Sequence, residues 1–188
     1  MSINEVRWLS ECGSTNAYAK EHFEEFGPVG AVYTTNQTAG RGRLGRGWVD
    51  APGKGLYYTA VIKTDLAQPS TLPLFASLAV CDALKQRYGI DCQIKWPNDL
   101  VFSGKKLCGI LLEISADLDQ IEYVVVGTGL NVLRGAYPPE LSDRAAALQE
   151  FAEPPVRREI VVHYLKALED NMTLLEEHGF PGIQEAYR

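Results

Sequence analysis

The sequence contains no long hydrophobic run and no excess of positive charge. None of its apolar stretches approaches the roughly 18 residues that a helix needs to cross a bilayer. The N-terminal segment MSINEVRWLSECGST lacks the apolar core of a secretory signal. The formal net charge is −6 at pH 7, whereas a dedicated nucleic-acid binder usually has a basic surface. We therefore expect a cytoplasmic protein that neither enters a membrane nor binds DNA.

Metal-binding and disulfide patterns are also missing. The chain has four cysteines that form no CxxC pair and have no histidine cluster near them: Cys12, Cys81, Cys92 and Cys108. This spacing predicts neither a zinc site nor a disulfide framework. We expect buried, reduced thiols instead.

Strand and helix patterns alternate along the 188 residues, of which 46% are hydrophobic. This is enough to bury one core of ordinary size, and no repeat or low-complexity linker divides the chain, so we expect a single domain over residues 1–188. The last expected strand is apolar along its middle, as in a strand buried on both faces. Together the patterns predict an α+β domain with helices packed against a sheet. The expected strands are residues 6–9, 30–37, 55–63, 91–96, 106–115 and 121–132.

Helical signals occur in three segments. The side chains of residues 14–16, Ser-Thr-Asn, can cap a helix over residues 17–26, which Gly27 and Pro28 would end. Residues 72–88 carry large apolar side chains at helical spacing, and Gly89 is placed to end that helix. The spacing predicts one buried stripe of Leu74, Leu78, Cys81, Leu84 and Tyr88.

The third helix is long and amphipathic. It is expected to begin near Pro155 and to be broken by HGFPGI, residues 178–183. Its apolar face would consist of Val161, Tyr164, Leu165, Leu168, Met172 and Leu175.

One short loop is strongly positive although the chain as a whole is acidic. The segment AGRGRLGRGW, residues 39–48, carries three arginines and four glycines. Arginine forks match carboxylate or phosphate oxygens, and glycines let the backbone approach such a ligand closely. The three like charges repel one another, so we expect the loop to become ordered only when an anion compensates them. Trp48 offers a flat aromatic face on which a base can stack. The loop therefore predicts a site for a small polyanion such as a nucleotide.

A solvated loop and an RNA-binding tract of the RGG kind are the alternatives for residues 39–48. The loop lies between two expected strands of a folded domain, which is unlike a disordered RGG tail. The acidity of the chain and the lack of stacking aromatics beyond Trp48 also weigh against RNA.

A second group of candidate residues lies in IKWPNDLVFSGKKLCGILLE, residues 94–113. Pro97 biases the residue before it towards an extended backbone, so Asn98 and Asp99 are expected in a turn at a strand end. FSGKK has hairpin-turn chemistry, which would return Lys106 on a paired strand. Asp99 is then a candidate ligand of Mg²⁺, and Lys106 supplies a compact positive charge. An Asx turn with solvated lysines is the alternative.

A third pattern, GTGLNV at residues 127–132, ends the apolar strand. Its glycines allow a ligand to approach, and Asn131 can hydrogen-bond a phosphate or a ribose. A bulge or a tight strand end is the alternative. Neither this pattern nor the arginine loop matches GxxxxGK[ST], so a P-loop ATPase is not predicted.

Five motifs together resemble the catalytic domain of the biotin protein ligases, or biotin–[acetyl-CoA-carboxylase] ligases. The basic loop with KWPND is the most specific part of this resemblance, which covers roughly residues 10–135. It implies a mixed β-sheet flanked by helices, the α+β fold shared with lipoate ligases and class II aminoacyl-tRNA synthetases. In the order of the family, the motifs are STN at 14–16, GRGRLGRGW at 40–48, KWPNDL at 95–100, KKLCGILLE at 105–113 and GTGLN at 127–131.

The resemblance implies a two-step reaction. Biotin and Mg-ATP would form biotinyl-5′-AMP and pyrophosphate, and a lysine of a biotin carboxyl carrier protein would then accept the biotinyl group. ATP and biotin are therefore the expected substrates, and Mg²⁺ is the expected metal. The resemblance also implies a homodimer, but the sequence does not identify the surface that would pair. The alternatives are a lipoate-type ligase and a module that binds biotin or its adenylate without transfer. The arginine loop with KWPND favours biotin, and Lys106 weighs against a mere binding module.

The resemblance also assigns roles to individual residues. Catalytic roles fall to Lys106, Arg41 and Arg43. Biotin contacts fall to Ser14, Thr15, Asn16, Gln37, Gly40, Arg41, Gly42, Arg43, Lys106 and Gly109. Nucleotide contacts fall to Arg43, Arg46, Trp48, Asn98, Asp99, Lys106 and Asn131, with loop solubility as the alternative role of Arg46.

The chain departs from the family pattern at both ends. No winged-helix DNA-binding domain precedes Ser14, which implies a monofunctional ligase that does not repress transcription. The small SH3-like β-barrel of the family does not follow QEAYR in this sequence, which is either naturally short or a truncated piece of a longer protein. That domain helps with nucleotide and acceptor handling, so we expect its loss to affect transfer more than adenylation.

Overall fold

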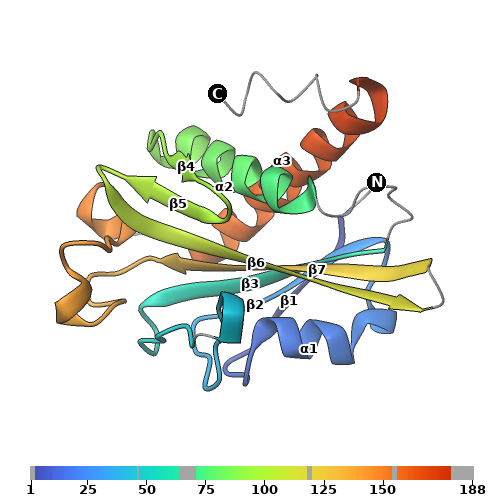
Figure 1. Ribbon diagram of the computed structural model, residues 1–188, viewed down its shortest axis with the longest axis horizontal. Helices are drawn as coiled ribbons and strands as arrows, with labels where there is room; N and C mark the ends of the chain where they lie inside the picture. Colours follow the sequence, from blue (N-terminus) through green and yellow to red (C-terminus); the bar gives the residue numbers. More distant parts are fainter. Residues whose placement is uncertain (1–2, 46, 64–70, 118–119, 154–155, 179–188) are drawn as a thin grey trace.

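One mixed sheet organises the computed structural model of the protein, which describes residues 3–45, 47–63, 71–117, 120–153 and 156–178 (Figure 1). Its seven strands lie in the order β1-β2-β3-β7-β6-β5-β4. β1 runs parallel to β2, and each other neighbouring pair is antiparallel. The strands are β1 Ile3–Trp8, β2 Val29–Thr34, β3 Gly55–Ile62, β4 Gln93–Lys95, β5 Asp99–Phe102, β6 Lys105–Asp117 and β7 Gln120–Asn131.

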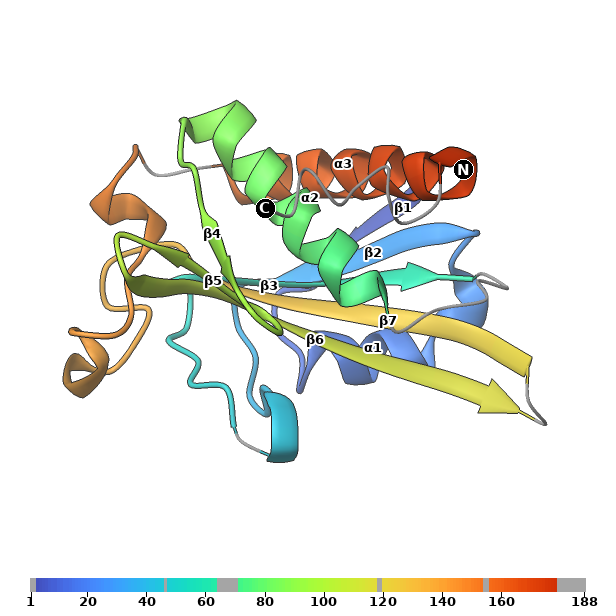
Figure 2. The same ribbon diagram turned by 45° about the horizontal axis from the view of Figure 1, so that its top comes forward.

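Helices cover both faces of this sheet (Figures 1 and 2). α2 (Leu72–Tyr88) and α3 (Arg157–His178) pack against each other on one face. α1 (Thr15–Glu21) lies on the opposite face, on the same side as the arginine-rich loop. Because side chains alternate along a strand, β3 serves both layers: Tyr58 belongs to the core under α2 and α3, and Val61 to the core under α1.

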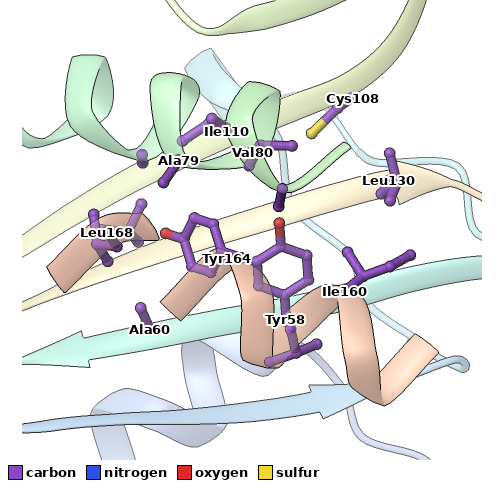
Figure 3. Packing of buried hydrophobic residues seen from close by; sticks show 14 of the residues in the cluster. Tyr58, Ala60, Ala79, Val80, Cys108, Ile110, Leu130, Ile160, Tyr164 and Leu168 are labelled. Atoms are coloured by element: carbon purple, nitrogen blue, oxygen red, sulfur yellow. The ribbon is translucent and has the colours of Figure 1, made fainter. Parts of the chain in front are cut away.

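The larger core lies between the sheet and the pair α2 and α3 (Figure 3). Tyr58 of β3 and Tyr164 of α3 are both fully buried, with ring centres 4.8 Å apart and ring planes tilted by 59°. Tilted aromatic pairs of this kind add to the stability gained from burial. The packed layer holds the sheet in place, and its opposite face is left to form the candidate site.

α2 is buried more widely than the predicted stripe. Leu78 and Leu84 are buried as expected, whereas Leu74, Cys81 and Tyr88 are only partly buried. The helix packs on the sheet with one side and on α3 with another, so residues outside the stripe are buried as well. These further residues are Leu72, Phe75, Ala76, Ser77, Ala79, Val80 and Ala83.

The predicted helix over residues 17–26 is wrong at both ends. α1 begins at Thr15 and ends at Glu21, and a 3₁₀ turn follows at Phe23–Glu25. The capping prediction is wrong as well, because Ser14 occupies the N-cap position without a side-chain capping bond. Thr15 and Asn16 instead direct their side chains to partners on other elements.

Most other elements confirm the prediction. The bounds of α2 are those expected, and Gly89 ends it with φ 67°, the left-handed backbone that favours glycine. The turn in FSGKK is confirmed by positive φ at Ser103 and Gly104, but it joins β6 to β5, a short strand that was not predicted. The expected face of α3 is buried from Val161 to Met172, while the side chain of Leu175 and residues 179–183 lie outside the described part.

All four cysteines are free in the structure, as expected, although only Cys108 is fully buried. Within the described ranges, no helix has the length and apolar character needed to span a bilayer.

Candidate active site

A cavity of about 300 Å³ opens on the face of the sheet that carries α1. Its wall combines the start of α1, the arginine-rich loop, the turn between β4 and β5, and the middle of β6 and β7. Segments far apart in the sequence therefore meet in one concave site, which is the usual form of a small-molecule site.

Three glycines form the floor of this cavity: Gly109 of β6, and Gly127 and Gly129 of β7. A Cβ atom on Gly129 would lie 2.8 Å from Cε2 of Trp48, and one on Gly109 would lie 2.6 Å from Cζ3 of the same ring. A Cβ atom on Gly127 would collide with the amide of Asn16. The absence of these side chains lets Trp48 and Asn16 lie directly against the sheet.

One end of the cavity is polar and carries no net charge on its lining. Thr15, Asn16 and Gln37 line it, and Thr59 of β3 lies behind them; all four are buried. The backbone N–H of Thr15 donates to Oε1 of Gln37 at 2.8 Å. The hydroxyl of Thr59 donates to Oδ1 of Asn16 at 2.7 Å and lies 2.9 Å from Oγ1 of Thr15. The side chains that face a ligand here are held by one connected network.

The other end of the cavity collects positive charge. Nζ of Lys106 lies 2.8 Å from Oδ1 of Asp99 and 5.1 Å from the ring centre of Trp48. Lys106 is fixed at the start of β6, where its backbone pairs with Val101 on one side and with the segment around Ala145 on the other. The ammonium group of Lys106 can face a ligand anion in this position. Its ion pair with Asp99 reduces the free-energy cost of holding the positive charge there.

The arginine-rich loop closes over this charged end. Arg41 and Gly47 form an antiparallel bridge, and the backbone N–H of Trp48 donates to the carbonyl of Gly40 at 3.0 Å. At the tip, Nη1 of Arg43 donates to Oδ1 of Asn98 at 3.0 Å. The guanidinium groups of Arg41 and Arg43 belong to exposed residues, so they can turn towards an anion without leaving a buried partner.

Asn98 connects the loop to the edge of the sheet. Its Nδ2 donates to the carbonyl of Ile110 at 2.8 Å, and its own carbonyl accepts the N–H of Ile110 at 2.9 Å. The prediction of a turn at this position is confirmed. The side chain anchors the turn on β6 and presents its oxygen to Arg43.

The structure brings most of the predicted site residues together. The residues that line the cavity are Ser14, Thr15, Asn16, Gln37, Arg41, Gly42, Arg43, Trp48, Asn98, Asp99, Lys106 and Gly109. Gly40 lies beside it and borders a second cavity under the loop. Arg46 lies outside the described residues.

Asn131 is the predicted residue that the structure does not bring to the cavity. It ends β7, is buried, and donates from Nδ2 to the carbonyl of Ala146 at 3.1 Å. The alternative of a tight strand end describes Asn131 better than a ligand contact does. The glycines of GTGLNV form the floor of the cavity, and Asn131 ties the end of β7 to a neighbouring segment.

Sequence reasoning missed Tyr57, Thr59 and Glu113. Tyr57 lines the cavity, and burial together with a hydrogen bond to Asp50 raises the pKa of its hydroxyl well above the usual value. Thr59 is the polar residue in the otherwise apolar strand GLYYTAVI, and Glu113 is the acidic end of KKLCGILLE. Those interruptions of apolar runs were the available signals.

No group of three or more histidine, cysteine, aspartate or glutamate side chains is placed to hold a metal ion in the part of the chain that the structure describes. Asp99 is a single carboxylate beside Lys106. This donor set fits Mg²⁺ only if phosphate oxygens complete its coordination, which is the usual arrangement for magnesium at a nucleotide.

Comparison with known proteins agrees with this geometry. The model of the biotin/lipoate A/B protein ligase family matches residues 11–131. The bifunctional ligase/repressor BirA of Bacillus subtilis is 35% identical over 177 residues, which are 91% of this chain and 54% of that protein. The biotin–[acetyl-CoA-carboxylase] ligase of Paracoccus denitrificans is 38% identical over 152 residues, 79% of this chain and 60% of that protein. The chain thus spans about half the length of the BirA relative.

The fold also matches solved structures. The biotin protein ligase from Aquifex aeolicus, solved in complex with biotin and ATP, superposes with a TM-score of 0.87 at 32% identity, covering 98% of this chain and 77% of that chain. The expected α+β fold, a mixed sheet flanked by helices, is confirmed. The family model covers more than half of the sequence, and its range includes every segment that lines the cavity. This chain belongs to the biotin/lipoate A/B protein ligase family.

Proposed function

We propose that residues 1–188 form one catalytic domain of a biotin–protein ligase. It would activate biotin with ATP to give biotinyl-5′-AMP and then transfer biotin to a lysine of a biotin carboxyl carrier protein. The observation that carries the proposal is the polarity of the cavity: an uncharged hydrogen-bonding end and a cationic end share one glycine floor. Biotin has a cyclic urea at one end and a carboxylate at the other, which matches this division.

The urea is assigned to the polar end. Ser14, Thr15 and Gln37 offer hydroxyl and amide groups to its N–H and C=O groups, and Asn16, whose amide bonds to Thr59 and Glu113, supports them from the cavity wall. The ring of Trp48, which lies against Gly109 and Gly129, offers an apolar surface to the fused rings and the alkyl chain. Gly40 and Gly42 allow the loop backbone to approach the alkyl chain of biotin on the side opposite the sheet.

The choice of biotin over lipoate follows from the same end of the cavity. Lipoate ends in a dithiolane, which neither donates nor accepts strong hydrogen bonds. It would leave Thr15 and Gln37 buried without ligand partners, and sites built to hydrogen-bond a ligand reject analogues that lack those groups.

Adenylation is assigned to the cationic end. The carboxylate oxygen of biotin attacks the α-phosphorus of ATP, the bond from that phosphorus to the bridging oxygen breaks, and pyrophosphate leaves. Both reactants are anions, so Arg41, Arg43 and Lys106 lower the barrier by holding them together and stabilising the charge on phosphorus. Mg²⁺, held by Asp99 together with phosphate oxygens, would supply further positive charge when bound.

The nucleotide is assigned to the side of the cavity formed by Trp48, Asn98 and Asp99. The indole offers its exposed part to adenine while its other face rests on Gly109 and Gly129. Arg46 is a further proposed nucleotide contact, whereas Asn131 would act only by anchoring the strand end beside the cavity.

Transfer completes the reaction. The amine of the acceptor lysine attacks the carbonyl carbon of the mixed anhydride, the bond to the phosphate oxygen breaks, and AMP leaves. The loop of residues 39–48, closing over the adenylate, would keep water away until the acceptor arrives. A biotin carrier domain is therefore the proposed protein partner; a homodimer and a cytoplasmic location are further parts of the proposal.

The test uses the purified 188-residue chain with biotin, Mg-ATP and a biotin carrier domain. Pyrophosphate release and the mass of the acceptor are followed in one sample, with lipoate replacing biotin in a parallel sample. Biotin-dependent pyrophosphate release and a heavier acceptor would support both steps. Pyrophosphate without acceptor modification would support adenylation and contradict transfer by this chain alone. Neither signal from folded protein, or a signal with lipoate only, would overturn the proposal.

A further inference from the structure

Glu113 lies outside the first cavity but contacts the network that lines it. The residue belongs to β6, faces the same side of the sheet as Gly109, and borders the second cavity under the loop. Its Oε2 accepts a hydrogen bond from Nδ2 of Asn16 at 2.8 Å, and its Oε1 lies 2.6 Å from Nζ of Lys20. Asn16 is 4% exposed, so the orientation of its amide group is set by its protein partners.

The carboxylate determines which way the Asn16 amide points. A carboxylate can only accept hydrogen bonds, and the carbonyl of Leu111, 3.4 Å from Nδ2, can only accept as well. Both acceptors therefore require the NH₂ group of Asn16 on their side. Oδ1 of Asn16 is left on the opposite side, where it accepts from Thr59.

This orientation passes along the hydroxyl groups of Thr59 and Thr15. Thr59 has one hydroxyl proton and gives it to Oδ1 of Asn16 at 2.7 Å. The proton of Thr15 then has two protein acceptors, Oγ1 of Thr59 at 2.9 Å and Oε1 of Gln37 at 3.1 Å. With its proton turned inward, Thr15 presents lone pairs to the cavity that it lines.

Gln37 completes the pattern. Its Oε1 accepts the backbone N–H of Thr15 at 2.8 Å, which leaves its NH₂ group to donate elsewhere. The cavity therefore shows an acceptor at Thr15 and a donor at Gln37. If Asn16 were inverted, Thr59 would give its proton to Thr15, and Oε1 of Gln37 would be the one acceptor left to the Thr15 proton among these groups, so that proton could turn into the cavity.

We propose that Glu113 is a positioning residue that fixes this donor and acceptor pattern, and that the pattern selects a cyclic urea. The inference rests on the proposed function, since it concerns the part of the cavity assigned to the urea of biotin. A urea N–H meets the acceptor of Thr15, and the urea carbonyl meets the donor of Gln37. Lys20 has a separate part, because its ammonium group pairs with Oε1 of Glu113 and Asn16 bonds to Oε2.

Two features of the structure keep the pattern constant. Partial burial works to raise the pKa of Glu113, but hydrogen bonds from Lys20 and Asn16 outweigh it and hold the pKa below its usual value. Glu113 is thus an acceptor at neutral pH. Gly127 lets the Asn16 amide lie directly against β7, within reach of Glu113.

The test compares the wild-type chain with Glu113→Gln, which has the same size but can turn either an NH₂ group or an oxygen to Asn16. Biotin binding is measured by calorimetry, and the KM values for biotin and ATP and kcat by pyrophosphate release. We expect Kd and KM for biotin to rise about tenfold, the loss typical of a mispaired buried hydrogen bond. KM for ATP and kcat should change less than about twofold, because the cationic end is untouched.

Two further variants separate orientation from structure. Lys20→Met removes the ion pair but keeps the contact of Glu113 with Asn16, and should leave KM for biotin within about twofold of wild type. Glu113→Gln combined with Asn16→Asp exchanges donor and acceptor: the new amide on β6 donates to the new carboxylate on α1, which still accepts from Thr59. This exchange should recover part of the affinity for biotin that the single Glu113 variant loses, since the carbonyl of Leu111, 3.4 Å from Nδ2 of Asn16, then faces an acceptor.

Each outcome bears on one of the two proposals. If the wild-type chain fails to bind biotin, the proposed function is wrong and this inference falls with it. If wild type binds biotin and Glu113→Gln binds it equally well, the inference is overturned while the function stands. A Glu113 variant that changes KM for ATP and kcat in parallel with KM for biotin, or a double variant without recovery at an unchanged melting temperature, would show a structural role only and also overturn it.

Discussion

Replacing Lys106 with alanine should stop adenylation without unfolding the chain. The ammonium group lies 2.8 Å from Asp99 and 5.1 Å from the ring centre of Trp48, at the cationic end of the cavity. The two side chains of the ion pair are 36% and 29% exposed, so its loss should cost at most about 1 kcal/mol of folding stability. Loss of a group that stabilises developing charge typically costs about 3 kcal/mol of transition-state stabilisation, a roughly 10²- to 10³-fold lower rate.

The assay is biotin-dependent exchange of pyrophosphate into ATP, paired with a thermal melt of each variant. Lys105→Ala is the matched control, because Lys105 is the neighbouring lysine on the same strand and donates to the carbonyl of Ser142 at 2.7 Å, outside the cavity. We expect exchange to be lost in the Lys106 variant and kept in the control. Undiminished exchange by Lys106→Ala, or equal losses in the two variants, would refute the assignment of the catalytic charge to Lys106.

Three further predictions concern the loop, the floor and a thiol. Arg43→Gly should release biotinyl-5′-AMP several-fold faster, because its contact with Asn98 is lost; unchanged release after dilution would exclude a retaining role for the loop. Gly129→Ala should raise KM for ATP several-fold by displacing Trp48, with KM for biotin less affected; the opposite order would contradict the assigned nucleotide side. Burial and the negative charge of Asp50 raise the pKa of Cys12 to about 11, so alkylation of Cys12 should be slower than that of a free thiol at pH 8 and should accelerate up to about pH 11.

The charged half of the site was predictable because its residues lie close together in short sequence segments. The arginine loop and KWPND each carry more than one cavity-lining residue within ten positions, and a hairpin turn signal places Lys106 next to Asp99. Strong local turn chemistry thus substituted for knowledge of the whole fold.

The polar half depends on partners that the sequence separates widely. Thr59 contacts Asn16 across 43 positions, and Glu113 contacts it across 97. These contacts arise from strand register, which places Thr59 opposite Gly127 and Glu113 opposite Val125. Local propensity carries no information on such register, because a one-residue slip would move every side chain to the other face.

The predicted bounds of α1 were wrong for a related reason. Ser14, Thr15 and Asn16 have the side chains of a helix cap, and local rules assign them to capping. In the structure, the side chains of Thr15 and Asn16 bond instead to groups from β3, β6 and the loop that follows β2. Tertiary hydrogen bonds to buried partners outweigh a local cap, so the local capping rule misplaced the start of α1.

The charge distribution gives a physical reason to assign a small polyanion to this site. The chain carries a net charge of −6, yet Arg41, Arg43 and Lys106 meet around one cavity with Asp99 as the carboxylate among them. At physiological salt, charges are screened over about 8 Å, so these cations act on a ligand inside the cavity and little beyond it. A nucleic acid would extend beyond the cavity, where the rest of a chain with net charge −6 offers it no overall attraction. A nucleotide places all its charge within reach of the three cations, and a carboxylate that arrives from the polar end meets it there.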